Sequence, residues 1–178
     1  MNELEAYVKD AERLGFFAAA PLDMCALEAR PEIRMLCAPD KCESYGKTWV
    51  CPPGCGELPE CAARLAGFHA ALLIESKYEH VDTGDLVYMK VLAAEHNRRL
   101  LALRELVARE HPKVWFLSTG SCEFCEKCSY PSAPCQKPEI LRGSVSAYGL
   151  DVERICESAG VEYAFAAGTV RYIAFLLI

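Results

Sequence analysis

Four cysteines in the C-terminal part of the chain are spaced as ligands of one metal centre. Cys122, Cys125 and Cys128 are separated by two residues each. Cys135 follows after six more. Thiolates two residues apart can contact successive corners of an iron–sulfur cubane, as in the bacterial ferredoxin run, whose fourth cysteine comes sooner and binds another cluster. The longer gap lets Cys135 return to the same cluster, so we expect residues 120–143 to form a ferredoxin-like iron–sulfur loop.

Zinc is the main alternative at these four cysteines. It takes four thiolates tetrahedrally, often from two C-x2-C pairs separated by a longer stretch, and three closely spaced cysteines fit that pattern less naturally. A c-type haem needs a histidine directly after a C-x-x-C pair, where this chain has Glu126 and Ser129. The spacing therefore favours an iron–sulfur cluster, with zinc as the alternative.

A second group of cysteines occupies residues 37–61 and predicts another metal site. Two adjacent prolines, Pro52 and Pro53, stiffen its centre and limit backbone freedom. Five thiols for four positions leave one in excess, and either Cys55 or Cys61 could complete the site. Cys61 should gain thiolate character at the start of a short helix. Because this spacing is less diagnostic, zinc competes more strongly here. The five candidates are Cys37, Cys42, Cys51, Cys55 and Cys61.

Composition places these cysteines in a reducing environment. The 178 residues are 52% hydrophobic, so the chain can bury a core without crosslinks, and eleven cysteines cannot all pair. The net charge of −6 and the absence of a Lys and Arg cluster argue against nucleic acid as a partner. No signal-like segment or run of roughly 20 apolar residues is present. We expect a cytoplasmic protein with no membrane contact.

Periodicity predicts the elements that hold the two loops. In residues 85–110 apolar side chains recur every three or four positions, which is typical of a helix with one face toward a core. Short apolar runs between turn residues predict strands. The expected order is a helix ending before Gly15, extended segments at 16–20 and 33–36, a helix over 59–67, strands at 68–74 and 114–118 on either side of the 85–110 helix, a helix over 150–159 and a strand at 169–178.

This order predicts an α/β or α+β fold. A small mixed sheet flanked by helices should support the two cysteine-rich metal-binding loops at one end. We expect residues 1–178 to form a single domain. Cys156 and His96 fall on apolar helical faces, so both are expected to pack in the core, and the same reading applies to the isolated Cys25.

Three groups of residues form a pattern that is more specific than any of its parts: Cys37, Cys42, Tyr45-Gly46-Lys47, Trp49 and Cys51-Pro52-Pro53; Cys122, Cys125, Cys128, Cys135 and Pro138; and Gly149-Leu150-Asp151-Val152. Across most of the chain this pattern resembles the family called domain of unknown function 2284, cysteine-rich predicted metal-binding proteins. The resemblance implies that Cys37, Cys42 and Cys51 are shared ligands. It favours Cys61 slightly over Cys55, leaving the fourth ligand open, and it implies no activity.

The leading functional expectation is an iron–sulfur protein with two [4Fe-4S] clusters that passes electrons to or from an unidentified redox partner protein. Eight cysteine ligands would leave no iron open for a substrate, so electron transfer is what remains. One alternative is an enzyme whose N-terminal cluster is held by only three cysteines and binds substrate at its fourth iron. The other is a zinc-stabilised interaction module.

Overall fold

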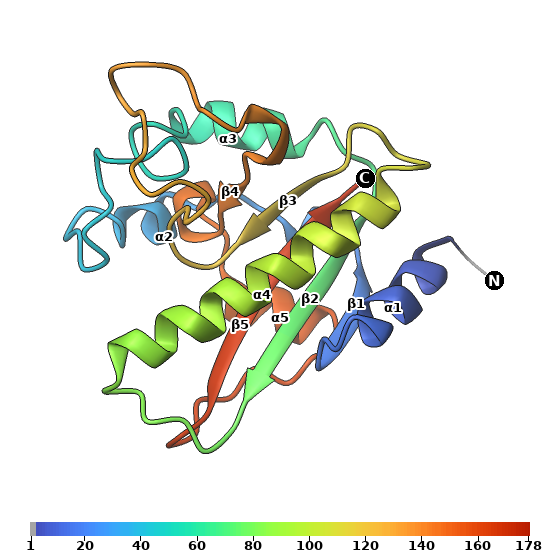
Figure 1. Ribbon diagram of the computed structural model, residues 1–178. Helices are drawn as coiled ribbons and strands as arrows, with labels where there is room; N and C mark the ends of the chain where they lie inside the picture. The colour runs from blue at the N-terminus through green and yellow to red at the C-terminus, as the bar shows by residue number, and fades with distance from the viewer. Residues whose placement is uncertain (1–2) are drawn as a thin grey trace.

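The computed structural model describes residues 3–178, which form a mixed five-stranded sheet flanked by helices (Figure 1). The strand order is β1-β2-β5-β3-β4, and only the β3–β4 pair among these strands is parallel. This α+β architecture confirms the expected fold class. The strands are β1 (Ala18–Leu22), β2 (Ala71–Tyr78), β3 (Trp115–Ser118), β4 (Gly143–Ser144) and β5 (Val170–Leu177). The α-helices are α1 (Glu3–Arg13), α2 (Pro31–Met35), α3 (Leu58–Leu65), α4 (Leu86–Val107) and α5 (Val152–Ser158).

The two faces of the sheet carry separate apolar cores. On one face α1 and α4 cover alternate residues of β2 and β5, such as Leu72 and Leu176. The opposite residues of the same strands, such as Leu73 and Phe175, pack against α3 and α5. In Figure 1, α4 crosses in front of the sheet, and α3 lies near the cysteine-rich segments at its upper end. Burial on both faces explains why the central strands read as continuous apolar runs.

The sheet also fixes where the two cysteine-rich loops begin and end. Residues 119–142 leave β3 after Ser118 and return to β4, which runs parallel beside β3, with Ser118 opposite Ser144. Asn97 of α4 accepts a hydrogen bond from the Ser118 hydroxyl at 3.0 Å. The long helix therefore holds the point at which the second cysteine loop leaves the sheet.

The sequence predicted most of these elements, but it missed β4 and misplaced three others: β1, which was expected at 16–20 and begins two residues later, α2 and β2. α1, α3, α4, α5, β3 and β5 lie where they were expected. Residues 33–36 were expected to be extended, and this was wrong, because Pro31 begins a short helix at the position where its missing N–H is harmless. β2 starts at Ala71 and extends to Tyr78, four residues beyond the predicted end, because it pairs with β5 over its whole length. No helix in residues 3–178 is long and apolar enough to span a membrane.

One buried ion pair lies on the α5 side of the sheet. Glu75 of β2 is fully buried and pairs with Arg171 of β5, whose side chain is 6% exposed. Arg171 also donates to the Glu162 backbone oxygen at 3.0 Å. Burial raises the pKa of the Glu75 carboxyl, while the adjacent arginine lowers it. The guanidinium therefore compensates a carboxylate that cannot reach water.

Replacing Arg171 by Met should lower the free energy of unfolding by about 3–5 kcal/mol at neutral pH, because it leaves a buried charge without its partner. The loss should shrink at acid pH. Without Arg171 the pKa of Glu75 in the folded protein rises further above its pKa in the unfolded chain. The stability of the variant is therefore retained below the unfolded pKa and is lost as pH rises through the folded pKa. Denaturant unfolding followed by circular dichroism across this pH range measures the effect. In the Glu75→Gln/Arg171→Met control, the loss in free energy of unfolding should not depend on pH. A pH-independent loss in the Arg171→Met variant would show that an unpaired Glu75 carboxylate is not its cause.

Candidate metal centres

The structure brings the four cysteines of the second loop together. Cys122, Cys125, Cys128 and Cys135 all line one small cavity of about 20 Å³. Burial raises the pKa of the Cys122 thiol, against the opposing effects of the Phe124 backbone N–H and of Arg142, while the nearby Cys125 and Cys128 raise it slightly further. Four thiol groups around one enclosed space are a donor set for a thiophilic metal or an iron–sulfur cluster. Which of these the cavity binds is a separate question.

An aromatic contact from the first loop closes this cavity. Trp49 lines it, donates its indole N–H to the Ala133 backbone oxygen at 3.2 Å, and packs edge-on against Tyr130 with ring centroids 4.9 Å apart. The neighbouring Val50 also lines the cavity and is fully buried. The first loop thus supplies part of the wall around the second set of cysteines.

Three cysteines of the first loop gather around a different and larger cavity. Cys37, Cys42 and Cys51 line a space of about 210 Å³. Its remaining wall includes Ser144 from β4 and Ser146 just beyond it. Burial raises the pKa of the Cys37 thiol, and Cys51 and Cys42 add to the effect, against an opposing contribution from Arg34. Since Cys42 is exposed, this cavity is open toward the surface.

The other two cysteines of that loop form a buried pair with an arginine. Arg34 of α2 places its Nη1 atom 3.3 Å from the Cys55 sulfur and 3.7 Å from the Cys61 sulfur. Neither cysteine is among the residues, within the described chain, that line the cavity of Cys37, Cys42 and Cys51. The five predicted ligands are therefore divided into a set of three and a pair.

Charge is distributed unequally within this pair. A hydrogen bond from the Cys55 thiol, together with the Arg34 guanidinium, lowers the pKa of Cys61 to about 6 against the opposing effect of burial. The pKa of Cys55 is raised correspondingly. Thiolate character at Cys61 was expected from the helix N-terminus, but its principal sources are Cys55 and Arg34. The cation beside the pair thus favours one thiolate within it.

The two cavities are direct neighbours. Val50 lines the second cavity, and the adjoining Cys51 lines the first. The Cys51 thiol lies 3.7 Å from the Ser121 hydroxyl, and Ser121 directly precedes Cys122. Two short backbone segments, around Cys51 and Ser121, thus form a wall between the two sets of cysteines.

Sequence reasoning did not identify the two arginines beside these sets. Arg34 contacts the Cys55–Cys61 pair, and the buried Arg142 lies at the end of the second loop, where Cys122 and Cys51 act on its charge. A single arginine has no spacing pattern that would distinguish it from a surface residue. The only signal was its position close to a cysteine loop in the sequence.

The remaining candidates behave largely as expected. Cys156 is fully buried in the apolar core between α5 and the sheet. His96 is 1% exposed, its Nδ1 lies 2.8 Å from the Ser76 hydroxyl, and burial lowers its pKa to about 3. Both core assignments are confirmed. For Cys25 the core assignment was wrong, because it sits on an exposed turn that Asp23 caps.

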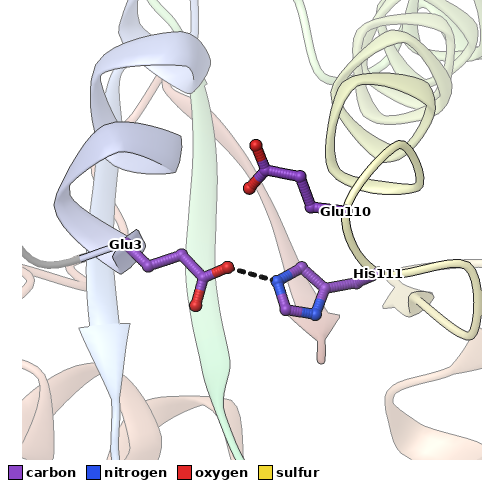
Figure 2. Close-up of side chains that lie close together, drawn as sticks. All are labelled: Glu3, Glu110 and His111. Carbon is purple, nitrogen blue, oxygen red and sulfur yellow. Dashed lines mark hydrogen bonds and ion pairs between the residues drawn. The ribbon is translucent and has the colours of Figure 1, made fainter.

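Figure 2 shows a separate cluster of Glu3, Glu110 and His111, in which one ligand atom of each residue lies within 4.8 Å of the others. Glu3 already pairs with His111, and Glu110 accepts a hydrogen bond from the Tyr7 hydroxyl at 2.8 Å. These contacts join the start of α1 to the end of α4. Because both carboxylates have donors, we interpret the cluster as a connection between helices.

Replacing Cys125 by Ser should remove most of the metal bound by the second set, because it deletes one of four donors around one cavity. The matched control is Cys156→Ser, which changes a buried thiol that lines neither cavity and should leave metal content unchanged. Elemental analysis of the two purified variants measures both effects. Equal metal loss from both variants would show that the assignment of Cys156 to the core is incorrect.

One comparison with known proteins supports metal binding by this chain. No curated protein and no solved structure matches the chain. A family model described as a predicted metal-binding protein matches residues 20–178, which contain all eleven cysteines and both cavities. The chain belongs to the domain of unknown function 2284 family of predicted metal-binding proteins.

Proposed function

We propose that this protein binds two [4Fe-4S] clusters and transfers single electrons to or from a partner oxidoreductase in the cytoplasm. The observation that carries the proposal is the adjacency of two cysteine-lined cavities across the wall that contains Cys51 and Ser121. Iron–sulfur clusters supply one-electron chemistry when bound, and the chain's part is to ligate them, shield them from water and set their potentials.

The second set supports a closed, carrier-type centre. Its four cysteines are all directed to one cavity, so a cluster held there would have every iron ligated by sulfur. Trp49 and Val50 exclude water from one side. Solvent exclusion and hydrogen bonds to sulfur are two of the means by which a protein sets a cluster potential. The Lys137 N–H, 3.4 Å from the Cys135 sulfur, provides one such hydrogen bond.

A substrate-binding cluster at the first set is the second candidate. Three cysteines line that cavity, while Cys55 and Cys61 are turned toward Arg34. A cluster held by Cys37, Cys42 and Cys51 alone would keep one iron open beside the Ser144 and Ser146 segment. If Cys61 is instead the fourth ligand, its lowered pKa prepares it for ligation, but it must leave Arg34.

Zinc remains a third candidate because of the size of the second cavity. A space of about 20 Å³ suits a single ion, since a water molecule needs roughly 10–15 Å³ by a comparable measure. A cubane is larger and requires Cys125 and Cys128 to move outward. Both residues also line an open surface hollow of about 740 Å³, which gives them room to do so.

Anaerobic purification followed by iron, sulfide and zinc analysis tests the three candidates together. We expect about eight irons and eight sulfides per chain, four of each for every cubane. Reduced samples should give an electron paramagnetic resonance signal that accounts for both clusters. Zinc without sulfide would exclude both redox functions and leave the interaction module.

Cys55→Ser and Cys61→Ser, made separately and together, test how the first cluster is held. If Cys61 is the fourth ligand, Cys61→Ser should lose about half of the iron, because one of two clusters is lost, while Cys55→Ser retains it. Iron and sulfide content with the visible absorption spectrum provides the measurement. Full iron retention in the double variant would instead support the open-iron cluster and weaken the pure carrier function.

A further inference from the structure

Arg142 is buried at the returning end of the second loop, where it is 2% exposed. Its Nη1 atom donates to the backbone oxygens of Ser118 and Gly143, both at 3.1 Å. Its Nη2 atom donates to three further oxygens along the outgoing arm. The guanidinium therefore ties the two arms of the loop together beside Cys122. The three further acceptors are Thr119 and Gly120, both at 3.4 Å, and Ser121.

These carbonyl groups solvate the guanidinium but do not neutralise it. Within residues 3–178 no carboxylate forms an ion pair with Arg142, and its Nε atom has no hydrogen-bond partner. The buried Arg171 provides an internal contrast, because it contacts the Glu75 carboxylate directly. A buried charge without a counter-charge is strongly unfavourable. In the described part of the chain, Arg142 therefore has no carboxylate in direct contact to balance its charge.

The groups whose charge acts on Arg142 are Cys122, Glu123 and Cys51, in decreasing order. Glu123 is exposed, so water screens its contribution. The two cysteines belong to different cavities, and each is a thiolate when it binds a metal. Arg142 thus lies at the wall between the two sets, near Cys122 of the second set and Cys51 of the first.

We propose that Arg142 is a counter-charge shared by the two cysteine-bound clusters, which it stabilises most when they are reduced. The inference rests on the proposed function. Each thiolate-ligated cluster becomes more negative when it gains an electron, so a fixed positive charge nearby favours the reduced form. The effect should be larger at the cluster of Cys122 than at that of Cys51.

Arg142→Met tests this role through the midpoint potentials of both clusters, measured by redox titration with paramagnetic resonance detection. We expect both potentials to fall. At the Cys122 cluster the ratio of reduced to oxidised form at a fixed ambient potential should drop about tenfold, equivalent to about 59 mV for one electron. Arg142→Lys, which keeps the charge but not the forked geometry, should retain both potentials. Glu123→Gln, which removes a negative charge, should raise the potential of the Cys122 cluster.

Other outcomes also decide the proposal. Unchanged potentials in an Arg142→Met protein with full iron content would overturn it, and a shift at one cluster only would overturn the shared role. If Arg142→Met and Arg142→Gln lose their clusters while Arg142→Lys keeps them at wild-type potentials, the charge is required and the proposal stands. If the Lys variant loses them too, the loop needs the fork geometry and the counter-charge is rejected. Wild-type protein that contains zinc without sulfide would instead refute the proposed function, before any variant is made.

Discussion

The fold gathers nine cysteines in one partly buried region, and any negative charge that thiolates carry there has to be balanced inside the protein. Two arginines occupy the positions where that balance is needed. Arg34 contacts both sulfurs of the Cys55–Cys61 pair, and Arg142 lies where Cys122 and Cys51 act on it. Both guanidinium groups also donate hydrogen bonds to backbone oxygens, such as that of Gly56 for Arg34 and that of Gly143 for Arg142. Positive charge in this part of the fold is thus placed opposite sulfur.

The sheet and α4 give these loops a rigid support that they do not supply themselves. β2 and β5 pair over eight residues each and are covered on both faces, so their ends are well fixed. α4 reaches the exit of the second loop through Asn97 and Ser118. From there the loop is held by side chains that bond its backbone, Arg142 from within the loop and Trp49 from the first loop. The two cysteine loops consequently support each other.

The sequence predicted the helices in which apolar residues recur at one regular spacing. α4 was recognisable because its apolar residues recur at helical spacing, and α1 and α5 for the same reason. α2 was missed because its five residues carry too little periodicity to outweigh the apolar residues Ile33, Met35 and Leu36, although Pro31 marked a helix start. The extent of β2 depends on pairing with β5 from the other end of the chain. Such long-range pairing leaves no local signal.

In the candidate site too, residues with a local sequence pattern could be predicted, whereas residues that meet only in the folded chain could not. C-x2-C spacing identifies Cys122, Cys125 and Cys128 because neighbouring ligands of one cluster are close in sequence. The division of the first loop into three cysteines and a pair depends on Arg34, which precedes them on α2 and is drawn to Cys55 and Cys61 only in the folded chain. Arg142 likewise becomes important only when the loop closes on itself.

The shared wall gives the two cysteine sets unequal but linked environments. Cys51 lines the first cavity, approaches Ser121 beside the second, and acts on the charge of Arg142. If both sets bind clusters as proposed, one cation and one sulfur–hydroxyl contact would link their charges. Trp49 and Val50 cover the second set on one side, while Cys125 and Cys128 also line an open surface hollow, and the first set is open at Cys42. Both sets can therefore be reached from the surface.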